Sequence, residues 1–512
     1  MTDFLLAHDL GTTGDKATLF EADGRLAASA YHPYPTRYPL PGRAEQDAGE
    51  WWDAVCVTSR ELMSKDPLAA RSLAAISFSG MMNGCLLVDG SGQPVRPALI
   101  HADIRSQAQC ERIAAAVGDE RAYQITGNRV APYFTLGKLS WLAEHEPESV
   151  SRARWCVQTK DYVGARLTGN WGITDRSDAS LTGCFDIGSG AWSDEMVSAG
   201  GIPKQLLPEV AASTAVLGRV TREAAAASGL PEGVPVVIGG GDGPCATAGS
   251  GAVLPGDAYH YMGGSSWVAA VTRGFVLDPK RRLSVFCGLS ENQFVLYGTV
   301  QSAGSAVDWL RSAVGPGRPE PGEDDFASLE RLAGSARPGS SGLFFLPYLM
   351  GERSPIWDAS ARGVFFGLSS AHGRAEMVRS VYEGVAYALG SNLAVLDEMG
   401  LGPSEVRVLG GAMRSRVWRS ILANVYDRPL VTMARLTHAC SCGAALAAGV
   451  GVGLFSDFES AAKRFSPAAE TEQPDPATAD VYRRCKPLFQ DLYLSLQERF
   501  ADLRILAADL SG

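Results

Sequence analysis

The stretch Val236-Val237-Ile238-Gly239-Gly240-Gly241-Asp242-Gly243 lies near the middle of the 512-residue sequence and has the features of a functional loop. Its β-branched, uncharged start predicts a buried strand, with Pro235 at the strand's edge. The three glycines allow a sharp bend and let a ligand approach the backbone closely. Asp242 then places a carboxylate where a buried strand ends, which is costly unless solvent or a ligand stabilises it. A plain strand-ending turn is the alternative interpretation of these residues taken alone.

The composition is that of a globular protein with more than one domain. A chain of 512 residues is too long for a single core. Hydrophobic residues make up 46% and charged residues 20%, both ordinary values for such proteins. The formal net charge of -10 argues against nucleic acid or an anionic membrane as a partner. The start at Met1 has no basic segment, so no signal peptide is expected, and no apolar run is long enough to span a bilayer.

The ten cysteines are scattered along the chain, and none forms a C-x-x-C pair. The seven histidines do not cluster with them. This distribution predicts reduced, mostly buried thiols in a cytoplasmic protein and disfavours a zinc site. His8 stands in a strand where an aliphatic residue would be usual, and we expect it to be a hydrogen-bonded core residue.

The N-terminal 31 residues predict three strands joined by tight turns. Strands are expected over 4–9, 16–20 and 26–31. The first turn, Gly11-Thr12-Thr13-Gly14, is either a plain hairpin turn or a phosphate-binding loop, because its amides and hydroxyls can bind phosphate. Asp9 before it and Lys16 after it are a metal-seeking carboxylate and a phosphate-seeking ammonium. No Walker A motif occurs in the sequence, so a nucleotide would be held by hairpins.

The second half repeats this arrangement. Strands are expected over 257–262 and 267–271, joined by the small, hydroxyl-rich turn Gly263-Gly264-Ser265-Ser266. The two hairpins are about 250 residues apart, which predicts a duplicated fold with one phosphate loop in each half.

The remaining second half predicts further strands, long helices and two loops. Strands are expected over 283–286, 294–300 and 406–409, and helices over 374–396, 417–425, 443–449 and 481–506. A surface insertion is expected over 314–325 and a Pro- and acid-rich loop over 467–479.

Two loops of the first half carry polar groups where strands or helices begin or end, so both are candidates for ligand binding. The expected strand 74–78 leads into Ser79-Gly80-Met81-Met82-Asn83-Gly84, and a strand over 86–88 follows. The segment His101-Ala102-Asp103-Ile104-Arg105 offers an acid and a base at a predicted helix start. Each loop taken separately is better explained by turn formation and helix capping than by a functional role.

Two signatures make the chain resemble the FGGY family of carbohydrate kinases, and within it the xylulokinases. The residues that fit the first signature are Tyr133, Thr135, Lys138, Trp141, Leu142, Glu144 and His145. Those that fit the second are Gly363, Phe365, Gly367, Leu368, Glu376, Ser380, Val381, Tyr382 and Glu383. The resemblance covers nearly the full length of the chain.

The resemblance implies an α/β fold of two actin-like (ribonuclease-H-like) ATPase domains flanking a catalytic cleft. Residues 1–245 would bind the sugar and carry the first phosphate loop, and residues 246–512 would bind ATP and end in a closing helix. The implied partner is a small-molecule sugar, with no nucleic acid and no membrane. The oligomeric state is left open, with a homodimer as one candidate.

The resemblance also implies roles for single residues. Asp242 would be the base that takes the proton of the attacking sugar hydroxyl, a role that suits a carboxylate in a glycine loop. Asp9 would hold Mg²⁺, in part through water. The implied sugar-binding residues are Met82, Asn83, Asp103 and Asp242. The implied nucleotide-binding residues are Gly11, Thr12, Thr13, Lys16, Gly263, Gly264, Ser265, Ser266, Gly304, Gly410, Gly411, Ala412 and Asn424.

Several of these positions depart from the xylulokinase pattern. The sugar loop of that group reads Gly-Gln-Met-His-Gly, whereas here Met81 and Asn83 replace the glutamine and the histidine. His101-Ala102-Asp103 stands where Trp-Asn-Asp is usual, Gly243 where asparagine is common, and Gly264 where a threonine is usual. These departures weaken the assignment of the sugar substrate. They do not affect the assignment of the chain as a carbohydrate kinase.

The sequence therefore predicts an ATP-dependent kinase of a pentulose, with D-xylulose as the first candidate. The nearest alternative is a member of the same family acting on another ketose or a polyol. Glycerol is disfavoured, because the Asn-Gln-Arg-Glu-Thr run of glycerol kinases is absent. Actin-like filament proteins and chaperones share the fold type but lack both signatures, and a catalytically inactive relative would not be expected to keep Asp9, Lys16 and Asp242.

Overall fold

The computed structural model describes residues 3–313, 315 and 323–511, which form two compact units. Unit 1 comprises Met1–Pro255, Val271–Leu296 and His438–Pro467, and unit 2 comprises Gly256–Ala270, Tyr297–Thr437 and Ala468–Gly512. Most of the insertion predicted over 314–325 lies outside the described residues.

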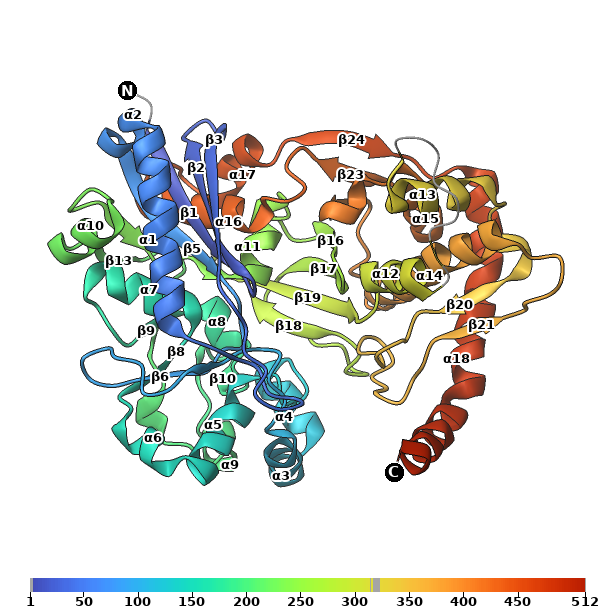
Figure 1. Ribbon diagram of the computed structural model, residues 1–512, viewed down its shortest axis with the longest axis horizontal. Helices are drawn as coiled ribbons and strands as arrows, with labels where there is room; N and C mark the ends of the chain where they lie inside the picture. The colour runs from blue at the N-terminus through green and yellow to red at the C-terminus, as the bar shows by residue number, and fades with distance from the viewer. Residues whose placement is uncertain (1–2, 314, 316–322, 512) are drawn as a thin grey trace. The chain divides into compact units, whose positions relative to one another are not determined.

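Unit 1 is built on a seven-stranded sheet with the order β13-β14-β5-β1-β2-β3, to which β15 adds beside β5 (Figure 1). Strand β1 pairs antiparallel with β2 and parallel with β5. The strands are β1 (Phe4–Leu10), β2 (Gly14–Glu21), β3 (Leu26–Pro33), β5 (Leu73–Gly80), β13 (Val216–Arg219), β14 (Pro235–Val237) and β15 (Gly240–Gly241).

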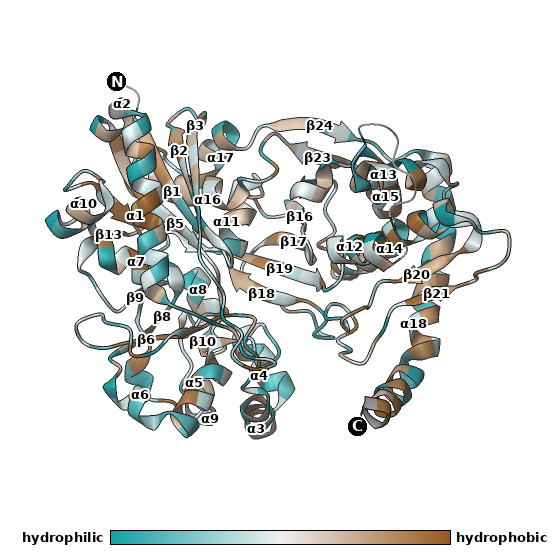
Figure 2. Ribbon diagram, viewed as in Figure 1, coloured by the Kyte–Doolittle hydropathy of each residue, from teal (hydrophilic) through white to brown (hydrophobic). Residues whose placement is uncertain are grey.

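Helices cover both faces of this sheet, so its central strands are apolar on both sides (Figure 2). Side chains alternate between the faces along β1: Leu6 joins one core cluster, and Leu5 and Ala7 join another. The first cluster includes residues of α1 (Ala48–Lys65), α7 (Thr159–Thr168) and α10 (Arg222–Ser228). The second includes residues of α11 (Asp242–Gly249), α16 (Ala439–Gly451) and α17 (Phe458–Phe465).

The rest of unit 1 consists of short helices and two-stranded sheets around a third core cluster. The helices are α2 (Pro67–Arg71), α3 (Gln107–Val117), α4 (Asp119–Thr126), α5 (Thr135–His145), α6 (Pro147–Arg152), α8 (Arg176–Ser180), α9 (Asp194–Ala199) and η1 (Lys204–Leu206). The strand pairs are β4 (Glu45–Gln46) with β7 (Ala98–Leu99), β6 (Leu86–Val88) with β8 (Trp155–Val157), β9 (Ile173–Asp175) with β12 (Glu209–Ala211), and β10 (Phe185–Asp186) with β11 (Ala191–Trp192).

A second seven-stranded sheet repeats the topology of the first, which confirms the predicted duplication. Its order is β18-β19-β17-β16-β22-β23-β24. Strand β16, like β1, pairs antiparallel with the next strand and parallel with a later one. The strands are β16 (Ala258–Met262), β17 (Ser266–Arg273), β18 (Ser284–Cys287), β19 (Gln293–Val300), β22 (Val406–Leu409), β23 (Leu430–Met433) and β24 (Ala468–Glu472).

Long helices make up most of the rest of unit 2. They are α12 (Gly304–Ala313), α13 (Asp325–Ser335), α14 (Arg374–Glu398), α15 (Arg416–Tyr426) and α18 (Pro476–Ser511). Smaller elements are η2 (Ser340–Gly342), η3 (Gly411–Arg414) and the pair β20 (Phe344–Leu346) with β21 (Val364–Phe366).

The prediction of a loop over 467–479 is wrong. Residues Ala468–Glu472 form β24, which pairs antiparallel with β23, and α18 begins at Pro476. The sequence Ala-Ala-Glu-Thr-Glu is mostly exposed and has little intrinsic strand preference. Its pairing with the edge of β23 is a tertiary effect that local composition does not reveal.

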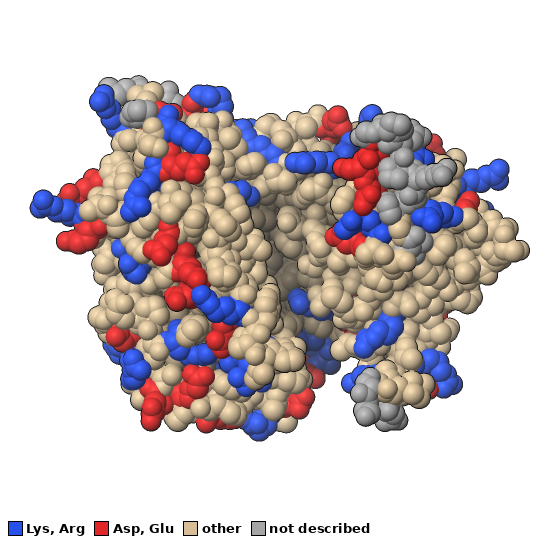
Figure 3. Space-filling model, in the orientation of Figure 1, with Lys and Arg blue, Asp and Glu red and all other residues tan. Residues whose placement is uncertain are grey.

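The predictions for His8 and for the cysteines are confirmed. His8 is fully buried, contacts Asp15 through Nδ1 at 2.9 Å, and stacks on Phe78. All ten cysteines are free, and eight of them are buried. Acidic and basic side chains are interspersed on the face shown in Figure 3. Within the described part of the chain, no helix is long and apolar enough to cross a membrane.

Candidate functional site

Asp242 is the first residue of helix α11, a helix that the sequence did not predict. Its Oδ1 accepts a hydrogen bond from the backbone N–H of Gly243 at 2.8 Å. A carboxylate in the first turn of a helix lies close to free backbone N–H groups, which favours negative charge there. Pro244 in the first turn was the available sequence signal for this helix, since proline is tolerated only near a helix start.

The three glycines before Asp242 are required because the loop packs tightly on its neighbours. Gly239 has φ +74°, and a Cβ there would lie 2.0 Å from the carbonyl oxygen of Phe78. A Cβ on Gly241 would lie 2.4 Å from Sδ of Met82. The glycines therefore bring the Asp242 loop into direct contact with strand β5 and with the predicted sugar loop, residues 80–84.

Strand pairing places Asp242 near Asp9. Asp9 is the last residue but one of β1 and lies opposite Ser79 of β5, and Gly240 of β15 pairs with the same Ser79. A side chain of α8 fixes the loop further, since Ser177 Oγ accepts the backbone N–H of Gly241 at 3.0 Å. The carboxyl ends of neighbouring parallel strands thus present both acids at one edge of the sheet.

Asp9 has one hydrogen-bond donor and one cation beside it. Ser79 Oγ donates to Asp9 Oδ1 at 3.0 Å, and Lys16 Nζ lies 3.5 Å from Asp9 Oδ2. Lys16 faces Asp9 because the two are direct partners in the β1–β2 hairpin. Burial raises the pKa of Asp9 above its usual value, and the Lys16 ammonium opposes this.

Burial, with the nearby charge of Asp9, raises the pKa of Asp242 to about 7. Two carboxylates in one poorly solvated site disfavour each other's ionised form. A pKa near neutrality suits a group that must accept a proton at physiological pH. Asp242, Asp9 and Lys16, predicted separately, are thus combined in one site of unit 1.

The first hairpin turn is held by side chains from outside it. Gln46 Nε2 donates to the carbonyl of Thr12 at 2.7 Å, and Tyr34 Oη donates to the carbonyl of Gly11 at 2.6 Å. Tyr31 Oη donates to the carbonyl and the hydroxyl of Thr13. These bonds fix the turn beside Asp9 and Lys16, and its binding of phosphate stays a prediction.

The predicted sugar loop lies beside the Asp242 loop through Met82. Asn83 adopts a left-handed backbone conformation with φ 64°. Its side-chain Oδ1 is buried and has no hydrogen-bond partner among the described residues. Buried acceptors are nearly always paired in native proteins, so this atom fits a ligand that donates a hydrogen bond.

Asp103 is in a different situation from the other predicted sugar-binding residues. It is fully buried, its Oδ2 accepts the backbone N–H of Ala44 at 2.7 Å, and both its oxygens accept from the Arg105 guanidinium. Helix α3 begins at Gln107, so this pair precedes the helix. The sugar-binding role of Asp103 stays a prediction, and its carboxylate is already paired with Arg105.

Unit 2 contains a cavity of about 590 Å³ around the second hairpin turn. Five predicted nucleotide-binding residues line it: Gly263, Gly264, Gly304, Gly411 and Ala412. The backbone N–H of Gly304 donates to the carbonyl of Gly263 at 3.0 Å, which joins the start of α12 to the turn. Side chains that sequence reasoning missed also line it: Glu330 and Phe326 of α13, Tyr382 of α14, Trp418 of α15, and Arg414.

Other predicted nucleotide-binding residues are absent from the lining of this cavity. Ser266 Oγ donates to the carbonyl of Tyr261 and contacts His260, and Asn424 bonds to Ser420 and to the backbone N–H of Asp475. Gly410 adopts φ +96°, and a Cβ there would lie 2.2 Å from the carbonyl oxygen of Met262. Ser266 and Gly410 contact Tyr261 and Met262, which line the cavity, whereas Asn424 bonds to residues outside the lining. The contact of all three with a nucleotide stays a prediction.

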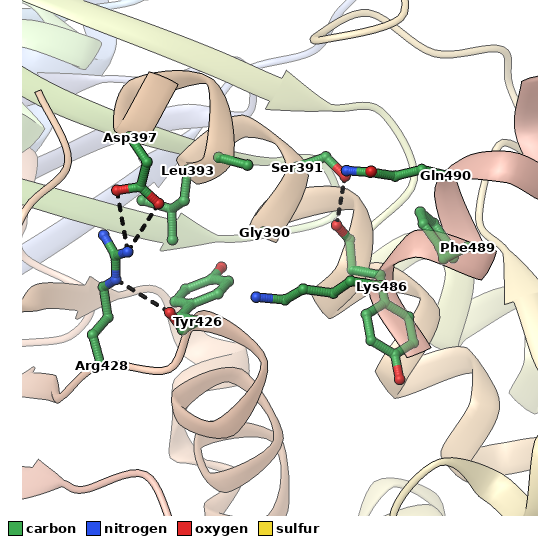
Figure 4. A pocket seen from close by; sticks show the side chains of 11 residues that line it. Gly390, Ser391, Leu393, Asp397, Tyr426, Arg428, Lys486, Phe489 and Gln490 are labelled. Carbon is green, nitrogen blue, oxygen red and sulfur yellow. Dashed lines mark hydrogen bonds and ion pairs between the residues drawn. The ribbon is translucent and has the colours of Figure 1, made fainter. Parts of the chain in front are cut away.

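A smaller cavity of about 50 Å³ lies among α14, α15 and α18 (Figure 4). Lys486 of α18 points into it, and Arg428 pairs with Asp397 at its edge. None of the predicted site residues lines this cavity.

Comparison with known proteins gives a consistent result over nearly the whole chain. Residues 4–249 match the N-terminal domain of the FGGY family of carbohydrate kinases, and residues 259–452 match its C-terminal domain. A xylulose kinase of Klebsiella pneumoniae is 33% identical over 96% of this chain and 98% of its own. A gluconokinase of Bacillus licheniformis is 29% identical over 100% of both chains.

The solved structures agree with these sequence matches. The crystal structure of xylulose kinase from Rhodospirillum rubrum aligns with a TM-score of 0.89 at 32% identity, over 97% of this chain and 100% of that one. With both family domains matched in order and relatives aligned almost from end to end, this chain belongs to the FGGY family of carbohydrate kinases.

Proposed function

We propose that this ATP-dependent carbohydrate kinase transfers the γ-phosphate of ATP to the terminal hydroxyl of a pentulose, with D-xylulose as the first candidate. The similarity to xylulose kinases supports this substrate. The equally extensive similarity to gluconokinases makes gluconate the principal competitor.

The observation that carries the proposal is the site around Asp242. The carboxylate takes the proton of the sugar hydroxyl while that oxygen forms its bond to the γ-phosphorus. The bond from the γ-phosphorus to the bridging oxygen breaks, and ADP leaves. The pKa of Asp242 near 7 allows this proton transfer at neutral pH.

The sugar would lie against Met82 and Asn83. Met82 contacts the Asp242 loop, so a sugar on this loop would be next to the base. The unpaired Oδ1 of Asn83 would accept a hydrogen bond from a sugar hydroxyl. Because asparagine is shorter than the histidine of the xylulokinase pattern and Met81 lacks an amide, we expect looser discrimination among pentuloses than in typical xylulokinases.

Charge on the phosphates would be balanced by Lys16 and by Mg²⁺ held at Asp9. Among the described residues no group of three or more acids, histidines or cysteines could hold a metal alone. The single carboxylate of Asp9 fits Mg²⁺, which usually keeps several waters and binds through one or two carboxylates and substrate phosphates. The ion, when bound, would neutralise charge that develops on the transferred phosphoryl group.

The predicted division of the chain gives sugar binding to residues 1–245 and ATP binding to residues 246–512. The cavity around Gly263 and Gly411 supports the second part, since its glycines let phosphates approach the backbone and its aromatic side chains can pack on a base. A cytoplasmic location fits ten free cysteines. A homodimer remains a proposal to be tested by light scattering.

The test is ADP release with Mg²⁺-ATP and a panel of D-xylulose, D-ribulose, gluconate, glycerol and a pentitol. We expect the highest kcat/KM for D-xylulose, with D-ribulose within about a hundredfold, because the Asn83 loop discriminates weakly. A preference for gluconate would show that the substrate is a sugar acid and not a pentulose. A preference for D-xylulose over D-ribulose of about a thousandfold or more would contradict the interpretation of the loop.

The Asp242→Asn variant tests the proton acceptor. The amide fills the same space but cannot accept the proton, so we expect kcat to fall by ~10²–10⁴ while ATP binding is retained. A variant that keeps more than about a tenth of the wild-type kcat would remove Asp242 from the role of base, since such a loss is below that expected for a positioned base.

A further inference from the structure

Lys138 is a fully buried lysine in the middle of α5, at a position that the proposed mechanism does not use. Its Nζ donates to the backbone carbonyl of Asn83 at 2.7 Å and to the backbone carbonyl of Tyr133. Within the described part of the chain, no carboxylate lies within ion-pair distance of it. A buried ammonium without a paired anion is unfavourable unless hydrogen bonds compensate for the lost solvation, and here two backbone carbonyls accept them.

The ammonium is one of three side chains that hold the backbone of the sugar loop. Thr135 Oγ1 donates to the carbonyl of Gly84 at 2.8 Å, and Gln158 Oε1 accepts the backbone N–H of Gly84 at 2.8 Å. Lys138 is the side chain bonded to Asn83 itself, whose left-handed backbone is uncommon for a residue other than glycine. The bond therefore fixes the residue whose side chain presents the unpaired acceptor.

We propose that Lys138 is a positioning residue for the sugar: its ammonium anchors the carbonyl of Asn83 and so fixes the loop that presents Met82 and Asn83. The proposal rests on the proposed function, since it assumes that this loop binds the sugar. Lys138 itself is fully buried and acts through Asn83.

Burial lowers the pKa of Lys138 to about 8. The groups that face it are the thiols of Cys85, Cys110 and Cys156 and the carboxylate of Asp103, which is paired with Arg105. Below pH 8 the charged ammonium makes charge-assisted bonds, which are about twice as strong as neutral ones. Above pH 8 a neutral amine can still donate, but the loop is held less firmly.

The experiment measures KM for the best sugar and for ATP between pH 7 and 9.5, in the wild type and in three variants. In the wild type we expect the sugar KM to rise about fivefold over this range, with the ATP KM unchanged. In Lys138→Arg the rise should be absent, because a guanidinium stays charged throughout the range. In Lys138→Met the sugar KM should be high at every pH and should not vary.

Thr135→Val is the matched control. It removes one bond to the same loop without removing the titrating group, so its sugar KM should be raised but should keep the wild-type rise with pH. A wild-type sugar KM that changes by less than about twofold up to pH 9.5 would overturn the proposal, as would an equal rise in Lys138→Arg.

Amide hydrogen exchange separates this proposal from the proposed function. Without any sugar, the peptide covering residues 80–86 should exchange about tenfold faster in Lys138→Met than in the wild type, and the peptide covering 11–14 should not change. Faster exchange in a protein that phosphorylates no sugar of the panel would leave the anchoring intact and reject the function. Unchanged exchange would reject the anchoring.

Discussion

The surroundings of Asp242 raise its pKa, and the same surroundings make its ionised carboxylate unfavourable in the folded protein. The backbone around it reduces the solvation of the carboxylate, and Asp9 adds a second negative charge. A folded state that raises the pKa of an acid prefers the protonated form, so keeping the acid ionised reduces stability. Functional sites often carry a cost of this kind.

We therefore predict that Asp242→Asn stabilises the fold in a pH-dependent way. The folded-state pKa of about 7 exceeds the usual 3.8, so the penalty is absent below about pH 4, grows as the pH rises and is complete above pH 7. The variant should gain ~1–3 kcal/mol at pH 8 and clearly less at pH 5, since the carboxylate is partly solvated.

Urea unfolding at both pH values, without nucleotide or divalent ions, measures this difference. A gain of equal size at pH 5 and pH 8 would show that the effect does not come from ionisation. A loss at pH 8 would show that the carboxylate stabilises the fold through contacts that an amide cannot make.

Residue-level prediction found groups that lie together where chemistry and strand position agree, and the roles of these residues stay predictions. Asp9, Lys16 and Asp242 were predicted from turns and strand ends, and strand pairing brings them into one site. Asp103 and Asn424 show the limit of this reasoning. Whether a polar side chain points to a ligand or to a neighbour depends on partners such as Arg105 and Asp475, which local sequence does not assign.

At the scale of elements, helices α7 and α8 are joined by a buried charge cluster beneath the Asp242 loop. Lys160 Nζ lies 2.6 Å from Asp161, 2.9 Å from Asp175 and 3.1 Å from Asp178, and none of these side chains is more than 1% exposed. Ser177 of the same helix α8 bonds to Gly241. One cation faces three acids, and burial raises the pKa of Asp178 well above its usual value.

We predict that Lys160→Met destabilises the protein by ~3–5 kcal/mol at pH 7.5, because it leaves buried acids without their cation. Without the ammonium the pKa values of the acids rise further, so the folded state binds protons more readily than the unfolded one. The loss should therefore shrink as the pH falls towards 5. Asp178→Asn, whose carboxyl already favours the neutral form, should change stability by less than about 1 kcal/mol.

Urea unfolding of Lys160→Met, Asp178→Asn and the double variant tests the cluster. The double variant should be more stable than Lys160→Met alone, because one uncompensated acid has been removed. Additive losses in the double variant would show that the two residues do not interact.

Element prediction succeeded for strands and long helices with clear periodicity, including both hairpins and α14. It failed for β24, whose pairing with β23 is not a property of its own residues, and for α11. The glycines and proline around Asp242 are as typical of a turn as of a helix start, and the tertiary packing of Cys245 and Ala248 favours the helix.

At the scale of the whole molecule, unit 1 is completed by a helix from far along the chain. Helix α16 packs on α11 at backbone contact: a Cβ on Gly443 would lie 2.0 Å from the carbonyl oxygen of Cys245, and one on Gly249 1.8 Å from that of Ala439. The match to the C-terminal family domain, residues 259–452, includes α16, yet this helix belongs to unit 1.

We predict that Gly443→Ala lowers the free energy of unfolding by at least ~2 kcal/mol, because the methyl group would meet backbone rather than a movable side chain. Gly90→Ala is the control, since a Cβ there has no neighbour within 4 Å. Urea unfolding should separate the two variants clearly. Equal stability of both would mean that α11 and α16 can separate at little cost.

The late position of α16 also bears on how the protein is made. When the first 255 residues have left the ribosome, the nascent chain still lacks the segment His438–Pro467 that covers one face of the first sheet. About two hundred more residues must be translated before that face can be closed, which takes ~10–40 s at ~5–20 residues per second. During this interval Leu5, Ala7 and Ala75 lack the part of their cover that α16 and α17 supply, so unit 1 matures after translation is nearly complete, although most of it is synthesised first.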